Sequence, residues 1–175
     1  GLVLNMHYPQ GGYQSQGNGM ALWTDPENQR RLVKLWGEIA RRYADEPAIQ
    51  GYGLINEPVV PELSNVNETV GQCQRLMQRC TDEIRRYDRN HIVFVEHVAA
   101  VKDMSTGENL WNKYPIDELW FLIDDDNAVY EGHFYTPAVF THQSAGDSVE
   151  YPKPCYVDNY LEYWVCLLYP SPSPR

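Results

Sequence analysis

Polar side chains that can move protons or form hydrogen bonds follow four short apolar runs of this sequence. They are His7, the pair Asn56 and Glu57, the pair Glu96 and His97, and the pair His133 and Tyr135. A positioned carboxylic acid can donate a proton to a leaving group. In an α/β barrel the active site lies at the carboxyl ends of the strands, so four such ends converging there would build one.

Each of these residues also has a structural interpretation. A single histidine at a strand end is more often a hydrogen-bonded structural residue than a ligand, and Glu before Pro is by itself a common dipeptide. For Glu96 and His97, the sequence supports a structural role and a substrate contact equally. The run of aspartates at 124–126 favours a turn or a solvated loop over a catalytic carboxylate.

Hydrophobic periodicity predicts the elements that position these side chains. Four strands are expected: a buried one at 2–7, then 49–55, 92–95 and a run from 128 to about 135. Asp25 and Pro26 predict the start of an amphipathic helix that Pro47 closes. A second apolar stripe at steps of three and four, from Val70 to Tyr87, predicts another helix. This alternation of strands and helices indicates a parallel α/β sheet.

Several local expectations follow from the same sequence. Proline disfavours the α region for the residue before it, so Glu57, which precedes Pro58, is expected to be extended. Residues 98–127 are expected to form an irregular loop with at most a short helix near 104–110, and residues 157–165 could form a further helix. Cys73 and Cys80 share a helix stripe, too far apart to bond to each other, and are expected to be inert small hydrophobic residues.

Composition excludes several classes of protein. The 175 residues are 43% hydrophobic and carry a net charge of −10, without a basic stripe that could bind nucleic acid. No apolar run is long enough to cross a membrane. The four cysteines have no zinc-site spacing, which argues against a thiolate metal centre.

A family resemblance rests on the motif residues. Gly53-Leu54-Ile55-Asn56-Glu57-Pro58 after one strand, with His133-Phe134-Tyr135 after a later one, resembles glycoside hydrolase family 5, the cellulase-like TIM barrels. Residues 5–12 and 140–143 resemble the family as well. The resemblance spans about residues 1–150 and implies strands three to six of a (β/α)₈ barrel. We therefore expect an α/β partial TIM barrel over residues 1–165, followed at 166–175 by a Ser/Pro-rich, non-native tail resembling adapter sequence.

The resemblance also implies roles for individual residues. Glu57 matches the family's acid/base, and Asn56 matches the residue that hydrogen-bonds the sugar 2-hydroxyl. His7 and His133 match histidines of the substrate site and its surroundings, and Tyr135 matches the phenol that contacts the nucleophile. The reaction needs two carboxylates and no metal or organic cofactor. The implied partner is a β-linked polysaccharide or oligosaccharide, with β-1,4-glucan favoured, cleaved by an endo-acting retaining enzyme.

Some family residues have no counterpart in this sequence. They are the arginine after strand two, the nucleophilic glutamate after strand seven and the tryptophan after strand eight. A full barrel needs about 250 residues, so we expect a truncated enzyme that is inactive alone. It is expected to be secreted or periplasmic, although the sequence contains no signal peptide. Two rival hypotheses are a non-catalytic carbohydrate-binding domain and a metal hydrolase using His7, Glu57 and His133.

Overall fold

A computed structural model describes residues 1–12 and 20–133 of the chain. The chain divides into two units, residues 1–132 and residues 133–175, and the elements below belong to the first. Tyr135, the possible helix at 157–165 and the tail at 166–175 lie outside the described residues. Within the described part, no helix combines the length and apolar composition needed to cross a membrane.

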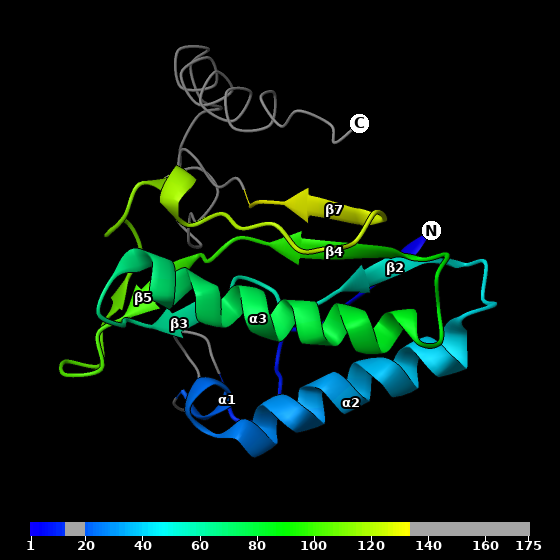
Figure 1. The fold of residues 1–175 in the computed structure, drawn as a ribbon, viewed down its shortest axis with the longest axis horizontal. Coiled ribbons are helices and arrows are strands. Elements are labelled where there is room, and N and C mark those ends of the chain that lie inside the picture. The colour runs from blue at the N-terminus through cyan, green and yellow to red at the C-terminus, as the bar shows by residue number, and fades with distance from the viewer. Residues whose placement is uncertain (13–19, 134–175) are drawn as a thin grey trace, which may run out of the picture. The chain divides into compact units, whose positions relative to one another are not determined.

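A four-stranded sheet forms the centre of the first unit. Its order is β1 (Leu2–Asn5), β2 (Ile49–Gly53), β4 (Ile92–Glu96) and β7 (Ala128–Glu131). All three neighbouring pairs are parallel. The long helices α2 (Pro26–Tyr43) and α3 (Val66–Arg85) lie side by side on one side of this sheet (Figure 1). The predicted parallel α/β arrangement is therefore confirmed.

Helix α2 begins and ends near the predicted positions. The Asp25 carboxylate accepts a hydrogen bond from the backbone N–H of Glu27, and Pro26 occupies the first turn. A short helix, α1 (Ala21–Thr24), precedes it. The apolar stripe places Trp36 in the core, where its indole N–H donates to the carbonyl of Leu54. Helix α2 is thus fixed directly to the chain that leaves β2.

Helix α3 buries the second predicted stripe. The Asn65 side chain caps its first turn by accepting from the N–H of Glu68. Cys73 and Cys80 are fully buried and neither is in a disulfide. Burial raises the pKa of the Cys80 thiol to about 12 and also raises that of Cys73. Both side chains therefore pack as neutral, apolar groups, as the stripe predicted.

Alternation along β4 separates the two faces of the sheet. Val93 and Val95 are fully buried, whereas Phe94 between them is half-buried and points to the face away from those valines. Gly51 of β2, which is in register with Ile92, has no room for a side chain: a Cβ there would lie 2.2 Å from the carbonyl oxygen of Ile92 and 2.8 Å from the Phe94 ring.

Strand β1 differs from its prediction. It was expected to be buried, but Leu2 and Val3 are 63% and 40% exposed. The reason is its position at the edge of the described sheet, where only β2 pairs with it. An apolar run specifies a strand, but whether the strand is buried depends on neighbours that the run itself does not encode.

The segment 98–127 is more regular than expected and has no helix near 104–110. Strand β5 (Ala100–Lys102) pairs in parallel with β3 (Val59–Pro61) and antiparallel with β6 (Asn109–Leu110), and a 3₁₀ turn, η1 (Ile116–Glu118), follows. Asp103 explains the missing helix. Its carboxylate accepts from the N–H and hydroxyl of Ser105, and Gly107 follows with φ +77°, which closes a turn between β5 and β6.

Candidate active site

Hydrogen bonds hold the carboxyl ends of three strands together. The N–H of Met6 donates to the carbonyl of Gly53, and the N–H of Asn56 donates to the carbonyl of Met6, both at 3.0 Å. On the other side, the N–H of Leu54 donates to the carbonyl of Phe94. The chain that leaves β2 is therefore fixed between those that leave β1 and β4.

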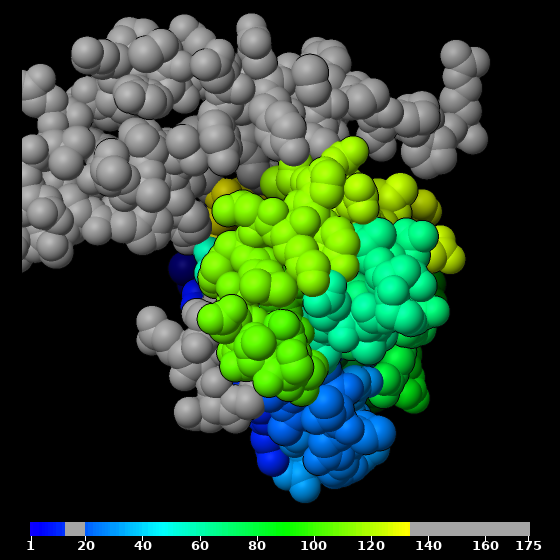
Figure 2. Space-filling model, turned by 90° about the vertical axis from the view of Figure 1, so that its left-hand side faces the viewer, coloured from blue at the N-terminus to red at the C-terminus, as the bar shows by residue number. Residues whose placement is uncertain are grey.

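Loops extend beyond this edge of the sheet. Figure 2 looks onto the side toward which the strand arrows of Figure 1 point, and the yellow-green segment between β4 and β7 forms a large part of it. The small sheet of β3, β5 and β6 lies beyond the carboxyl ends of β2 and β4 (Figure 1). Functional side chains of parallel α/β folds gather at this edge.

Glu57 has a backbone conformation that its sequence did not predict. It is not extended but has φ +45°, and it is the one residue other than glycine with positive φ in the described chain. Such a conformation costs a side-chain-bearing residue about 1–3 kcal/mol and persists only where its surroundings impose it. Here the N–H of Glu57 donates to Oε2 of Glu96 at 2.8 Å. The residue before a proline normally prefers an extended backbone, and Glu57 departs from that preference where it bonds to a residue 39 positions away.

The neighbours of Glu57 differ in exposure. Asn56 is 7% exposed and Glu96 is 3% exposed, whereas Glu57 itself is half-buried. Of the two glutamates, Glu57 is the more open to a substrate.

An aromatic stack lines the exit from β4. The rings of His97 and Trp120 are parallel to within 19° with centroids 4.7 Å apart, and Trp120 meets Tyr130 of β7 edge-on. The hydroxyl of Tyr130 accepts from the N–H of Ile123. His97 is therefore part of the packing between β4 and β7, which supports the structural interpretation of this histidine.

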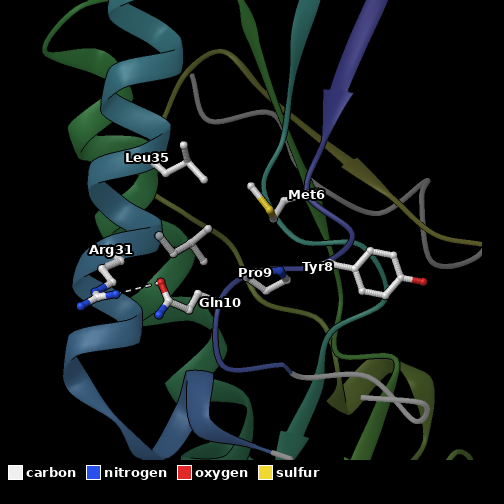
Figure 3. A pocket seen from close by; sticks show the side chains of 7 residues that line it. Met6, Tyr8, Pro9, Gln10, Arg31 and Leu35 are labelled. Carbon is white, nitrogen blue, oxygen red and sulfur yellow. Dashed lines mark hydrogen bonds between the residues drawn. The ribbon is translucent and has the colours of Figure 1, made fainter. Parts of the chain in front are cut away.

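His7 leaves β1 as an exposed side chain, next to Tyr8, which is 82% exposed. A pocket of about 290 Å³ lies between this segment and α2, lined mainly by apolar residues including Met6, Leu32 and Leu35. In Figure 3 the Tyr8 ring points away from α2, while Arg31 donates to the side-chain oxygen of Gln10 across the pocket. None of the described residues that line it is acidic, so the candidate acid Glu57 is not among them.

The remaining candidates lie elsewhere in the chain. His133 follows β7 by two residues, is half-buried and begins the second unit, and Tyr135 lies outside the described residues. Asp125 forms an ion pair with Arg85, with Arg85 Nε 2.7 Å from Asp125 Oδ2, while Asp124 and Asp126 are exposed. The aspartate run thus belongs to a loop, as expected, but its middle member is a structural ion-pair partner.

The metal-hydrolase hypothesis receives no support from the side-chain arrangement. Among the described residues, no three His, Cys, Asp or Glu side chains come together in a way that could hold a metal ion. Within the described part of the first unit, His7 and Glu57 therefore do not belong to such a group. The candidate groups at this edge are the carboxyl group of Glu57 and the buried side-chain amide of Asn56 beside it in the chain.

Comparison with known proteins settles the family. The sequence model of the family described as Cellulase (glycosyl hydrolase family 5) matches residues 2–165. This chain belongs to glycosyl hydrolase family 5. Endoglucanase C from Acetivibrio thermocellus is 35% identical over 147 residues, which cover 83% of this chain and 37% of that enzyme. Cellodextrinase A from Ruminococcus flavefaciens is 29% identical over 147 residues, 82% of this chain and 38% of its own.

Solved structures agree with this family 5 assignment at the level of fold. The chain superposes on Thermotoga maritima Cel5A, solved with mannotriose, with a TM-score of 0.59 at 22% identity, covering 94% of this chain and 50% of that one. A hyperthermophilic endo-β-1,4-glucanase solved with substrate gives 0.62 at 22% identity, with 94% and 49% covered. The predicted partial TIM barrel is confirmed. The chain spans less than two fifths of the length of the two curated relatives above.

Sequence reasoning about this family 5 chain missed two contacts. One is the hydrogen bond from Glu57 to Glu96, and the other is the stack of His97 on Trp120. The sequence held an indication of the first contact, since Glu96 ends a strand that neighbours the strand leading to Glu57. Trp120 lies in an irregular segment with no periodic pattern, so nothing in the sequence pointed to it.

Proposed function

We propose that this chain supplies the acid/base part of the active site of a retaining, endo-acting β-1,4-glucanase. Glu57 is the general acid: its carboxyl group donates a proton to the glycosidic oxygen as the bond from that oxygen to the anomeric carbon breaks. A second carboxylate attacks the anomeric carbon, and Glu57 then takes a proton from the water that releases the sugar. The observation that carries this proposal is the half-open Glu57 at the carboxyl end of β2, held between the ends of β1 and β4.

The other predicted residues have supporting roles in this proposal. Asn56 is the hydrogen-bond partner of the sugar 2-hydroxyl, next to the acid in the chain and already buried. His7 contacts the substrate from the end of β1, where its side chain is exposed. His133 and Tyr135 act from the segment after β7, as the family resemblance implies. The reaction uses no metal and no organic cofactor, because two carboxylates are sufficient.

The substrate proposal rests on the names of relatives. Endoglucanase C is named for a glucan and Cellodextrinase A for cellodextrins, and one of the solved structures above is named an endo-β-1,4-glucanase. Cel5A of Thermotoga maritima was solved with mannotriose as well as with cellobiose, so mannan is the second polymer to test. An enzyme that cleaves such a polymer meets it outside the cell, which favours a secreted or periplasmic location.

The experiment joins this chain to the remaining barrel strands of Endoglucanase C, which supply the nucleophile. Glu57→Gln keeps the shape of the side chain but cannot donate a proton, so hydrolysis of a cello-oligosaccharide should fall about 10²- to 10⁴-fold while binding persists. An aryl cellobioside with an activated leaving group should lose much less, because its departure needs no protonation. Equal losses on both substrates would show that Glu57 is not the acid.

Two further outcomes bear on the proposal. The chain alone should give negligible hydrolysis of soluble cellulose, because an acid without a nucleophile cannot form the glycosyl-enzyme intermediate. Ordinary turnover by the chain alone would mean that one of its own carboxylates attacks. A joined barrel that binds oligosaccharide without cleaving it would favour the rival hypothesis, a non-catalytic carbohydrate-binding domain.

A further inference from the structure

Glu96 is an unusual residue for its position. It is the last residue of β4 and lies two positions after Phe94, so both point to the face of the sheet away from Val93 and Val95. Its side chain is 3% exposed. Glutamate is rarely buried so completely unless its oxygens are hydrogen-bonded, because removing a carboxylate from water is costly.

The contact of Glu96 is with the main chain of Glu57. Oε2 of Glu96 accepts the backbone N–H of Glu57 at 2.8 Å. This bond fixes the peptide between Asn56 and Glu57 from one side, and the ring of Pro58 restricts the backbone on the other side. Because a carboxylate acceptor makes a shorter and stronger bond than a neutral one, the Glu57 peptide is held firmly.

We propose that Glu96 is a positioning residue for Glu57: its carboxylate holds the Asn56–Glu57 peptide so that the acid reaches the glycosidic oxygen. This inference rests on the proposed function. Glu96 does not touch the substrate, because it is buried and one of its oxygens is bound to the Glu57 main chain. The same two facts argue against Glu96 as the nucleophile, which must be free to approach the anomeric carbon.

Two substitutions separate the acceptor from the charge. Glu96→Gln keeps an oxygen that can accept the Glu57 N–H but removes the negative charge, and Glu96→Met fills similar space without an acceptor. Glu108→Gln, on the exposed turn between β5 and β6, is the matched control for losing a carboxylate. Each is made in the whole chain and in the joined barrel described above, and thermal unfolding establishes that each variant folds.

The activity readout is the leaving-group dependence of kcat and KM. For Glu96→Met, kcat on a cello-oligosaccharide should fall by about 10- to 100-fold, the scale of a small misplacement of a catalytic group, with little change in KM. On 2,4-dinitrophenyl cellobioside the loss should be much smaller. Glu96→Gln should recover most of the activity, and Glu108→Gln should match the unmodified protein. Equal losses on both substrates, or a Gln variant as impaired as the Met variant, would overturn the proposal.

A spectroscopic readout is independent of catalysis. In the whole chain, the Glu57 amide proton should resonate downfield and exchange slowly because it is bonded to a carboxylate. The downfield displacement of this proton's chemical shift should be smaller in Glu96→Gln. In Glu96→Met the chemical shift should come close to that of a solvent-exposed amide proton. An unchanged Glu57 amide in Glu96→Met rejects the positioning role even if Glu57 is the acid. Conversely, if Glu57→Gln lacks leaving-group dependence, the proposed function fails, while this amide still reports whether Glu96 holds the peptide.

Discussion

The two ends of the four-stranded sheet use polar residues in opposite ways. At the amino-terminal end, the fully buried carboxylate of Asp88 accepts from the hydroxyl of Tyr52 at 2.7 Å and from the N–H of His91 at 3.0 Å. Arg85 donates to the carbonyls of Asp88 and His91 and pairs with Asp125. These contacts join the end of α3 to the segments that enter β4 and β7.

At the carboxyl end, two of the candidate side chains are more exposed and the backbone at one of them is strained. Glu57 is half-buried at φ +45°, and His7 is exposed. The bond that ties Glu57 to the neighbouring strand is donated by its main-chain N–H and does not involve its carboxyl group.

This difference between the two ends indicates that one end of the sheet serves stability and the other serves function. Barrels of this type place their catalytic groups at the carboxyl ends of the strands, and the opposite end serves stability. Substitutions at the amino-terminal end should therefore change the free energy of unfolding. Substitutions at Glu57 should change activity and can even stabilise the protein, because active-site strain reduces stability.

The largest loss of stability is expected from Arg85. Arg85→Met removes the partner of Asp125 and the donor to several carbonyls, and leaves a largely buried carboxylate without its counter-ion. Breaking a buried pair in this way costs about 3–5 kcal/mol. Arg41→Met, which breaks an exposed pair with Glu38, should have little effect. Urea unfolding of the whole chain measures both, and similar losses for the two variants would contradict the assignment of the stabilising role to this end.

A smaller loss is expected from Tyr52→Phe. Burial and the Asp88 carboxylate raise the pKa of Tyr52, so its hydroxyl stays protonated and donates to that carboxylate. Removing a hydrogen bond to a charged group costs about 1.5–3 kcal/mol. Tyr87→Phe, at a ring that is 40% exposed, is the matched control and should leave the unfolding midpoint in urea almost unchanged. A Tyr52→Phe variant as stable as the control would mean that the Asp88 cluster contributes little.

Lowering the pH should destabilise the amino-terminal end of the sheet. Burial opposes ionisation of Asp88, but hydrogen bonds from the His91 N–H and the Tyr52 hydroxyl outweigh it and hold its pKa below the ordinary value. The hydrogen bonds from Arg85 lower the pKa of Asp125. A lowered pKa in the folded state means that these groups stabilise the protein above the unfolded value of about 3.9 and lose that contribution as the pH falls through the folded value.

The corresponding measurement is the free energy of unfolding against pH. It should change little between pH 7 and about 5 and then fall toward pH 3. Asp125→Asn cannot lose a charge in this range, so its curve should be shallower than that of the unmodified chain. If the two curves run parallel through this range, Asp125 is not one of the groups responsible.

Features with a strong local pattern could be predicted from the sequence. Helix α2 was recognised because Asp25, Pro26 and a regular apolar stripe all favour the same structure, and α3 because its stripe extends over several turns. The parallel sheet followed from the alternation of the elements. The motif around Glu57 indicated the family and the candidate acid without any coordinates.

Features set by contacts between distant segments could not be predicted. The local preference before Pro58 favours an extended Glu57, and the structure instead pairs a positive φ with a bond to a residue 39 positions away. Strands β3 and β5 have three residues each, too few to show a period, and they exist because they pair with each other. The role of Arg85 depends on Asp125, 40 positions later, and a basic residue in a last helical turn has an ordinary local explanation.

The smallest predicted effect tests the strain at the carboxyl end. Glu57→Gly and Glu57→Ala both remove the carboxyl group, but only glycine adopts φ +45° without a steric penalty. The glycine variant should therefore be more stable than the alanine variant by about 1 kcal/mol, although glycine at an ordinary position is the less stable of the two. Urea unfolding of the two variants in the whole chain measures the difference in their free energies of unfolding. Glu108→Gly and Glu108→Ala are the control pair, in which the alanine variant should be the more stable. A glycine variant less stable than the alanine variant would mean that Glu57 is not strained, and the contrast between the two ends of the sheet would then rest on exposure alone.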